Sequence, residues 1–259
     1  MKTEINRHIN TFVSLLEKKL NTVLKREEMS QATVFHSKSP LFSIAIYGPV
    51  SGGRLTGFSH KTYHIDADYL LLHQNKILQR LYSLFGKGKT IYARQTVVAR
   101  IDKRATADFL EEHHLNAPLT GKYRYGLYHQ GELVSIAVFS GGRHMRDQPS
   151  DYRSFELLRF CHKSGYRVVG GISKLIRAFA VDFQPNDIMT YVDRDWSQDS
   201  SLQTLGFETL GITGVQQYWI MGDQRTPVRN ERDLENIQHE QPFGYLRSNA
   251  GSTKLLLRF

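Results

Sequence analysis

The fold of this chain is decided by the stretch Val168-Val169-Gly170-Gly171-Ile172-Ser173-Lys174, which follows a predicted strand and opens a predicted helix. Such a loop aims unpaired backbone N–H groups and the positive end of the helix at one point, which suits a phosphate or pyrophosphate. Gly170 and Gly171 carry no Cβ atom that would block close approach. The stretch matches neither the Walker A loop nor the GxGxxG motif, and an ordinary tight turn gives the same Gly-Gly pattern. It is therefore a candidate anion site.

Two polar side chains in this stretch extend the same interpretation. The Ser173 hydroxyl and the Lys174 ammonium would both bind a phosphate. The alternatives are a helix N-terminal hydrogen bond for Ser173 and simple solvation for Lys174.

The elements around the loop alternate between strands and short helices. Apolar residues recur at helical spacing from Ile172 to Phe183 and Pro185 follows, which predicts a helix over residues 171–183. Two shorter helices are predicted over Thr106–His114 and Ser200–Leu205. The predicted strands are Thr90–Ile101, Tyr125–Tyr128, Leu133–Phe139, Phe155–Cys161, Ile188–Val192, and a closing pair, Phe207–Thr213 with Gln217–Met221.

The N-terminal third and the tail carry weaker patterns. An amphipathic helix is predicted over residues 4–24, a strand over Leu41–Tyr47, and a second helix over residues 67–85 closed by Gly86. The tail is polar until Lys254–Phe259, which is predicted to add a final strand.

The composition narrows the class of protein. A chain of 259 residues with 40% apolar residues builds one large domain or two small ones. The single cysteine, Cys161, excludes an intrachain disulfide and a cysteine-based zinc cluster. His60 and His64 lie in a strand-like segment, so no metal site is predicted. With no apolar run of about 20 residues and no signal-peptide pattern, we expect a cytoplasmic protein without a membrane partner.

The net charge of +9 is concentrated near the N-terminus. Residues 1–92 hold 13 Lys and Arg against 6 Asp and Glu, whereas residues 93–222 hold 15 against 14. Residues 223–259 hold 6 against 5. Because a basic surface attracts polyanions, we expect any nucleic-acid contact, with DNA favoured, to involve residues 1–92. Solvated helix faces give the same charge pattern.

The order of predicted elements resembles the GNAT fold of acetyl-CoA-dependent N-acyltransferases. In that family a loop of pattern [RQ]xxGx[GA] binds the CoA pyrophosphate. This chain keeps Arg167 and Gly170 but has Ile172 at the last position, and Leu205-Gly206-Phe207 matches a family LGF motif. The resemblance implies a mixed α/β sheet flanked by helices, and an acetyl-CoA or other acyl-CoA cofactor held by residues 168–174. Leu202 stands where many members have the Tyr that protonates the leaving thiolate.

A longer series of blocks is similar to phage proteins that join a Vsr-like nuclease domain to a GNAT-like domain of the Mom type, which modifies adenine in DNA. The blocks are IYAR at 91–94, FLEEHHL at 109–115, LLRFC at 157–161, VVGGxSKL at 168–175, YxDRxWS at 191–197 and LGF at 205–207. The resemblance implies three parts: residues 1–89, a basic, degenerate nuclease-like domain; residues 90–222, a GNAT-like transferase domain; and residues 223–259, a C-terminal extension.

The nuclease-like part departs from that pattern. Residues 44–48 read IAIYG, where the resemblance expects a strand with a Glu. Asp66 and Asp68 are the acidic residues near an expected position, whereas a metal-dependent nuclease needs clustered carboxylates. We therefore expect a degenerate nuclease fold kept for DNA contact.

Three residues are candidates for the acceptor side of a transferase site. Asp193 follows a predicted strand and would orient or deprotonate an amine, or else cap a loop or pair with Arg194. His114 ends a helix and would act as a base or bind the target base, unless it only complements the helix dipole. Arg159, within a strand, needs an anionic partner, either Asp193 or a substrate group.

The sequence thus predicts an acyl-CoA-dependent transferase that modifies an exocyclic amine of a nucleic-acid base. Two alternatives stay open. One is a non-catalytic DNA-binding protein derived from a nuclease fusion, and the other is an N-acyltransferase that acts on a protein or small-molecule amine.

Overall fold

The computed structural model describes residues 2–145, 147–197 and 201–259. It forms two compact units, each built from segments that lie far apart in the sequence. The first unit contains Met1–Gln74, Val192–Ser200 and Gly211–Thr253. The second contains Asn75–Tyr191, Ser201–Leu210 and Lys254–Phe259. These units divide the chain at other places than the predicted boundaries after residues 89 and 222.

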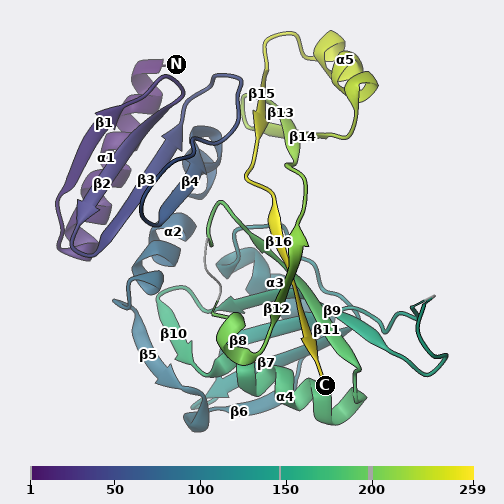
Figure 1. Ribbon diagram of the computed structural model, residues 1–259. Helices are drawn as coiled ribbons and strands as arrows, with labels where there is room; N and C mark the ends of the chain where they lie inside the picture. Colours follow the sequence, from purple (N-terminus) through teal and green to yellow (C-terminus); the bar gives the residue numbers. More distant parts are fainter. Residues whose placement is uncertain (1, 146, 198–200) are drawn as a thin grey trace. The chain divides into compact units, whose positions relative to one another are not determined.

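The first unit begins with a helix and a four-stranded sheet (Figure 1). The strands follow the order β1-β2-β3-β4; β1, β2 and β3 are antiparallel, and β3 and β4 are parallel. Strand β3 is buried along almost its whole length, as expected for a strand covered on both faces. The elements are α1 (Lys2–Leu20), β1 (Leu24–Glu28), β2 (Ala32–Lys38), β3 (Leu41–Tyr47), β4 (Thr62–Asp66) and α2 (Ala67–Leu84), the last of which runs on into the second unit.

A smaller antiparallel sheet completes the first unit. Its order is β14-β13-β15, and Trp219 and Ile220 on the central strand are buried. The elements are β13 (Gln217–Met221), β14 (Gln224–Val228), α5 (Glu231–Glu240) and β15 (Tyr245–Ser248).

The second unit is organised around a seven-stranded sheet of order β12-β16-β11-β9-β8-β7-β6. The sheet is mixed, because β9 and β11 are parallel whereas β6 to β9 are antiparallel. The elements are β6 (Val97–Arg100), α3 (Lys103–His113), β7 (Tyr123–His129), β8 (Glu132–Phe139), β9 (Ser154–His162), α4 (Gly171–Phe183), β11 (Asp187–Asp193), β12 (Glu208–Ile212) and β16 (Ser252–Arg258).

Successive side chains of a strand point to opposite faces of the sheet, and here both faces carry buried apolar side chains. A helix covers each face. On one face Phe179 of α4 stacks on Phe139 with ring centroids 4.0 Å apart. On the other face Leu110 of α3 lies in a buried cluster with Ile136 and Val138. The predicted fold class, a mixed sheet flanked by helices, is confirmed in this unit.

A short parallel pair, β5 (Lys89–Tyr92) with β10 (Tyr166–Val169), lies outside the main sheet. Strand β5 leads into the 3-10 helix η1 (Ala93–Gln95), and a second 3-10 helix, η2 (Gln203–Leu205), precedes β12. The single strand predicted over Thr90–Ile101 is therefore wrong. The chain turns at η1, where the Thr96 N–H and hydroxyl both donate to the Ala93 carbonyl.

Other predicted elements are confirmed or corrected. The helix over 171–183 and the strand Leu41–Tyr47 are confirmed, and β16 confirms the C-terminal strand. The helix over 4–24 ends earlier, at Leu20, because Asn21 adopts a positive φ of 52°. Of the short helix predicted over Ser200–Leu205, Ser200 lies outside the described residues.

The predicted closing pair of strands is wrong. Strand β12 is next to β16 in the seven-stranded sheet, whereas β13 pairs with β14 and β15 in the smaller sheet. No helix in the described part of the chain is long and apolar enough to cross a membrane.

Candidate functional site

The glycine loop joins β10 to α4 through a left-handed residue. Gly170 is the N-cap of α4 with φ 77° and ψ 4°, a conformation that side chains with a Cβ disfavour. No side chain caps this helix end. Val168 is buried and Val169 is exposed, so the loop lies at the surface with its first buried residue anchoring it. The amides of the first helical turn are therefore available to an anion.

The two glycines are needed for different reasons. A Cβ on Gly170 would lie 3.5 Å from the Ala93 Cβ, an ordinary contact, so its left-handed backbone is the constraint. A Cβ on Gly171 would lie 3.1 Å from Cγ1 of Val168 and 3.2 Å from Cδ1 of Leu127, so close packing is the constraint. The interpretation that both glycines open the loop to a ligand therefore holds at most for Gly170.

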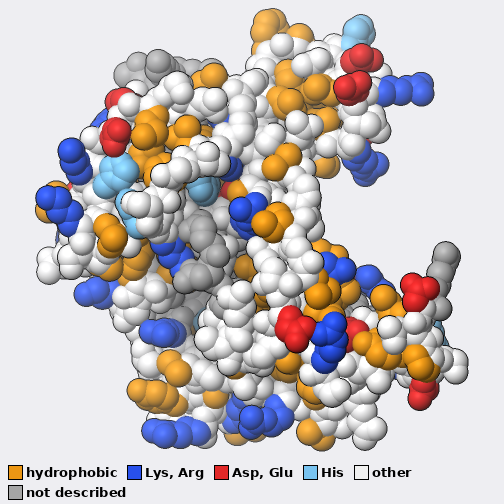
Figure 2. All heavy atoms as spheres, viewed as in Figure 1, with side chains coloured by type: hydrophobic (Ala, Val, Ile, Leu, Met, Phe, Trp, Pro, Cys, Tyr) orange, Lys and Arg blue, Asp and Glu red, His pale blue; other side chains and the backbone are white. Residues whose placement is uncertain are grey.

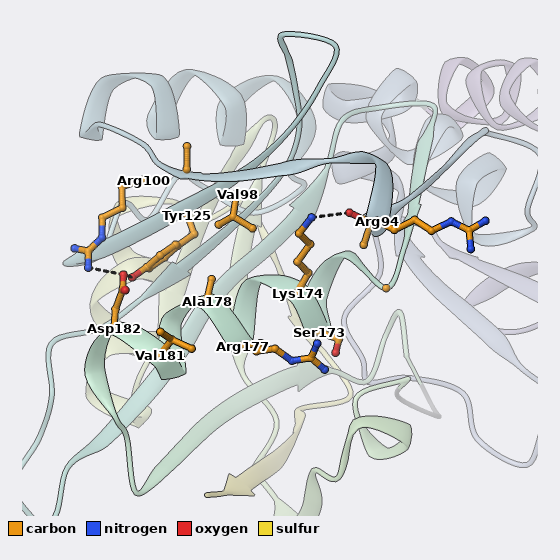
Figure 3. A pocket seen from close by; sticks show the side chains of 13 residues that line it. Arg94, Val98, Arg100, Tyr125, Ser173, Lys174, Arg177, Ala178, Val181 and Asp182 are labelled. Atoms are coloured by element: carbon orange, nitrogen blue, oxygen red, sulfur yellow. Dashed lines mark hydrogen bonds and ion pairs between the residues drawn. The ribbon is translucent and has the colours of Figure 1, made fainter.

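Lys174 is committed to the protein backbone. Its Nζ donates to the carbonyl of Ala93 at 2.8 Å (Figure 3). The same Nζ also donates to the carbonyl of Thr96. The side chain thus fixes the η1 turn beside the glycine loop. The structure gives Lys174 this positioning role in place of the solvated state that the sequence left open.

A hollow of about 770 Å³ opens beside this loop, between α4 and the η1–β6 segment (Figure 3). Its floor is apolar, with Val98, Ala178 and Val181 among the lining residues. Arg94 and Arg177 line the hollow, and no described carboxylate forms an ion pair with either. Ser173 and Lys174 also line it, so cationic and hydroxyl groups gather beside the open helix end.

Further along α4, the same hollow is lined by three polar side chains that are bonded to one another. The Tyr125 hydroxyl donates to Oδ2 of Asp182 at 2.5 Å, and Arg100 pairs with the same oxygen at 2.7 Å. Burial, and then the hydrogen bond with Asp182, raise the pKa of Tyr125. Tyr125 therefore holds its proton and is not suited to donate it as a general acid.

A second hollow of about 550 Å³ shares Ser173, Arg177 and Val181 with the first. It extends from α4 to Leu205 of η2 and to the end of β16 at residues 257–259. Ser173 and Arg177 therefore face two cavities. Sequence reasoning missed Arg177, although it lies one helical turn after Ser173 and the i, i+4 spacing puts both on one helix face.

Strand β9 is paired incompletely on the side of β11. The β9–β11 register covers the residues from Ser154 to Glu156, whereas β9 runs to His162. On its other side, the register with β8 shifts between Val138 and Phe139, so Leu158 forms a bulge. The described pairing of the parallel strands β9 and β11 thus ends before Arg159.

Arg159 follows that bulge and is half-buried. Its Nη1 donates to the Leu158 carbonyl at 2.8 Å and its Nη2 to the Ala117 carbonyl at 3.4 Å, whereas the buried Nε has no hydrogen-bond partner. Burial lowers the pKa of Arg159, and Glu156 opposes the shift. These partners are neutral carbonyl oxygens, and the pairing of Arg159 with Asp193 or with a substrate group stays a prediction.

His114 is the C-cap of α3 and is half-buried. Burial, and then the charges of Arg80 and Arg159, lower its pKa to about 4, so the ring is neutral at pH 7. The backbone N–H of Asn116 donates to its Nδ1 at 3.0 Å, and the Asn116 carbonyl lies 3.2 Å from the same atom. Nδ1 is therefore held against the backbone of Asn116 in either tautomer of the ring.

Asp193 is the last residue of β11 and organises the turn that follows. Its Oδ1 accepts the N–H of Asp195 at 2.9 Å, and its carbonyl accepts the N–H of Ser197 at 2.9 Å. This is the capping role that the sequence offered as an alternative. Its role as a base remains a prediction.

Asp195, which sequence reasoning missed, belongs to a buried ion network in the first unit. Arg54 bonds to Oδ2 of Asp195 at 2.6 Å and to Oδ1 of Asp66 at 2.5 Å. Arg225 pairs with Asp66 at 2.5 Å and with Asp68 at 3.2 Å. No local pattern indicates this network, because its members come from three distant segments.

This network accounts for the two carboxylates of the nuclease-like segment. Burial raises the pKa of Asp66, but its bonds with Arg54 and Arg225 outweigh that effect and hold the pKa below its ordinary value. Guanidinium groups thus occupy positions around Asp66 and Asp68 that a metal ion would need. Among the described residues no group of three or more His, Cys, Asp or Glu is arranged to hold a metal ion.

The basic excess of residues 1–92 is partly internal. Arg54 is 6% exposed and fully engaged with carboxylates, so it adds nothing to an outer basic surface. On the face drawn in Figure 2, Lys and Arg side chains are dispersed among hydrophobic and uncharged atoms. Nucleic-acid contact through residues 1–92 remains a prediction.

No protein-family model and no curated protein matches this chain. Solved structures that align with it include a histone acetyltransferase HPA2-related acetyltransferase from Corynebacterium glutamicum, with 12% identity over 63% of this chain and 96% of the other, at a TM-score of 0.38. The ribosomal-protein-S18-alanine N-acetyltransferase from Escherichia coli aligns with 11% identity over 63% and 93%, at 0.38.

A GNAT family acetyltransferase from Elizabethkingia anophelis, solved with acetyl-CoA bound, aligns with 10% identity over 64% of this chain and 99% of the other, at a TM-score of 0.33. Similarity of this size says nothing about activity. The fold is defined by this chain's own strand order.

Proposed function

We propose that this chain is an acyl-CoA-dependent acyltransferase whose acceptor is an exocyclic amine of a nucleic-acid base. The observation that carries the cofactor part is the left-handed Gly170 before the uncapped end of α4, with Ser173 and Arg177 beside it. Helix N-termini with nearby cations bind phosphate groups. The acceptor part rests on the basic N-terminal third and on the resemblance to Mom-type proteins.

The residues present fit the phosphates of such a cofactor. The N–H groups of Gly171, Ile172 and Ser173 would hold the pyrophosphate, and the Ser173 hydroxyl would add a donor. Arg94 and Arg177 line the adjoining hollow without a carboxylate partner among the described residues, so both can neutralise phosphate charge. Lys174 keeps the loop and η1 in register. When bound, an acyl-CoA would supply an activated thioester carbonyl.

The chain offers few groups for proton transfer. Leu202 has no proton to give, and Tyr125 is held by Asp182. Burial, and then the charges of Arg80 and Arg159, lower the pKa of His114 to about 4, so its predicted role as a base is disfavoured. Asp193 is the remaining candidate to accept the amine proton as the N–C bond forms and the C–S bond breaks.

Incubation of DNA and tRNA with the protein and acetyl-CoA, followed by mass spectrometry of the nucleosides, tests this proposal. An acylated nucleoside is the expected result. Titration calorimetry with acetyl-CoA separates the two parts of the proposal. Absence of CoA binding would overturn both the cofactor part and the acceptor part. CoA binding without a modified nucleoside would overturn the nucleic-acid acceptor and favour a protein or small-molecule amine in its place.

Asp193 can be examined with a matched pair of variants. Asp193→Asn retains an oxygen that accepts the Asp195 N–H, but it loses the charge of a base; Asp193→Ala loses both. If Asp193 is the base, both variants lose turnover and Asp193→Asn keeps its thermal stability. Full turnover in Asp193→Asn would leave only the turn as its role.

A further inference from the structure

Arg159 carries a positive charge that no hydrogen-bonded carboxylate among the described residues neutralises. Its guanidinium donates to two carbonyl oxygens, and its buried Nε donates to nothing in the described structure. A partly buried cation with only neutral partners loses hydration without gaining an opposite charge. The arrangement becomes favourable when an anion binds beside the guanidinium.

The neighbouring groups are donors and cations as well. His114 lies beside Arg159 in the fold, because its Nδ1 contacts the backbone of Asn116 while Arg159 Nη2 donates to the carbonyl of the next residue, Ala117. Arg80 and Arg159 are both close enough to His114 for their charges to act on the ring, and so is Lys76. Lys76 is partly neutralised, since its Nζ lies 3.7 Å from a carboxylate oxygen of Glu111.

The acidic group nearest to Arg159 on its own strand is engaged elsewhere. Glu156 accepts from Arg143 at 3.1 Å, and its influence on Arg159 is electrostatic. The cluster of Arg159, Arg80 and His114 therefore offers hydrogen-bond donors and positive charge together. Such a set selects an anion and disfavours an amine or another cation.

Solvent can reach this cluster. Asn116 and Ala117 are exposed, and Arg159, Arg80 and His114 are each half-buried. Strand β9 lacks a β11 partner at Arg159, so the edge that carries the cluster is open. A ligand can approach without unfolding of the sheet.

We propose that Arg159 binds a backbone phosphate of the nucleic-acid acceptor, with the positive charge of Arg80 nearby. This inference rests on the proposed function, because it takes the acceptor to be nucleic acid. The chain's net charge of +9 favours a partner that repeats the anion over one with a single phosphate. Arg159 then fixes the acceptor's position.

The experiment compares two ligands that differ only in backbone charge. One is a single-stranded DNA tetranucleotide, and the other has the same bases with neutral methylphosphonate linkages. Binding of each to the full chain is measured by titration calorimetry over a range of salt concentrations. We expect Arg159→Gln to weaken binding of the charged tetranucleotide about tenfold or more and to leave the neutral ligand unchanged. The slope of log affinity against log salt should fall by about one.

Two further variants keep the interpretation specific. Arg159→Lys retains the charge and should recover part of the affinity. Arg124→Gln is the matched control, since Arg124 likewise donates to backbone carbonyls, those of Ile101, Thr120 and Gly121, but lies on β7. Arg124→Gln should bind the charged tetranucleotide like the unmodified protein. Thermal melting of each variant shows whether it is folded.

The outcomes separate this inference from the proposed function. Equal affinity of Arg159→Gln and the unmodified protein for the charged tetranucleotide overturns the inference, even where acetyl-CoA binds normally. Loss of affinity for both ligands alike also overturns it, because the phosphate would then not be the group recognised. Binding of a phosphopeptide that depends on Arg159, with no binding of the tetranucleotide, would overturn the assignment to nucleic acid.

Discussion

The ammonium of Lys174 donates to the carbonyl of Ala93 at 2.8 Å, which ties the first turn of α4 to the η1 turn beside it. The same Nζ bonds to the Thr96 carbonyl. A residue that looks like a phosphate ligand in the sequence is therefore a brace for the loop that would hold the phosphate.

Replacing Lys174 with Met should weaken both stability and cofactor binding. The variant leaves two carbonyl oxygens without their donor, which costs about 1–3 kcal/mol of unfolding free energy. Urea unfolding measures that loss and calorimetry measures acetyl-CoA affinity. Lys103→Met, which removes an exposed lysine from α3, is the control and should change neither. Unchanged stability in Lys174→Met would contradict the bracing role.

Replacing Gly170 with Ala should separate backbone strain from ligand binding. The left-handed φ of 77° makes alanine unfavourable by about 1–2 kcal/mol. Gly131, in the β7–β8 turn, has φ 81° with open space where a Cβ would lie, so Gly131→Ala should lose a similar amount. Acetyl-CoA affinity should fall in Gly170→Ala and stay unchanged in Gly131→Ala. If the two substitutions lowered acetyl-CoA affinity equally, or if neither lowered it, the loop would not be the pyrophosphate site.

Stability should fall as the pH decreases from about 6.5 towards 4, because three histidines are held neutral in the native state. Burial lowers the pKa of His64, His114 and His162 to about 4 each. Between pH 4 and 6.5 these histidines bind protons in the unfolded chain but stay neutral in the native chain, so unfolding becomes more favourable as the pH falls. A single such group contributes at most about 3 kcal/mol.

Unfolding free energies at pH 7.5, 6 and 5 measure this effect. His64→Gln should be less stable at pH 7.5, since it loses the bond to the Tyr47 hydroxyl, but its stability should vary less with pH. His239→Gln removes an exposed histidine from α5 and should keep the full pH dependence. A pH-independent stability of the unmodified protein over this range would contradict the prediction.

The ion network around Asp66 should matter in two ways. Asp66→Asn leaves the buried Arg54 and the half-buried Arg225 with one carboxylate charge fewer beside them, which costs about 3–5 kcal/mol at neutral pH. Because the native pKa of Asp66 lies below its ordinary 3.8, its contribution is complete above that pH and is lost as the pH falls further. The difference in melting temperature between the variant and the unmodified protein should therefore be smaller at pH 3 than at pH 7.

Asp108→Asn provides the comparison for Asp66. Its side chain is 74% exposed and lies 4.0 Å from Arg104, so its removal should change the melting temperature little at either pH. Equal effects of the two substitutions would contradict a stabilising network in the first unit.

Helices and strands whose apolar spacing lies within one short segment could be predicted from the amino-acid sequence alone. The apolar spacing from Ile172 to Phe183, with glycines before it and Pro185 after it, set α4 to its observed bounds. Leu41–Tyr47 likewise gave β3 at its observed ends. Such patterns are readable because helix and strand periodicities depend on neighbours in the chain.

Contacts between groups that lie far apart in the chain became evident from the folded structure. The partners of Lys174 lie on η1, those of Arg54 lie on β4 and after β11, and the strand predicted to pair with β12 joins another sheet. The donors around Arg159 come from α2, α3 and β9, so their common charge is invisible in any one segment. Ion pairs and strand partners depend on the packing of separate segments, and no local periodicity encodes that packing.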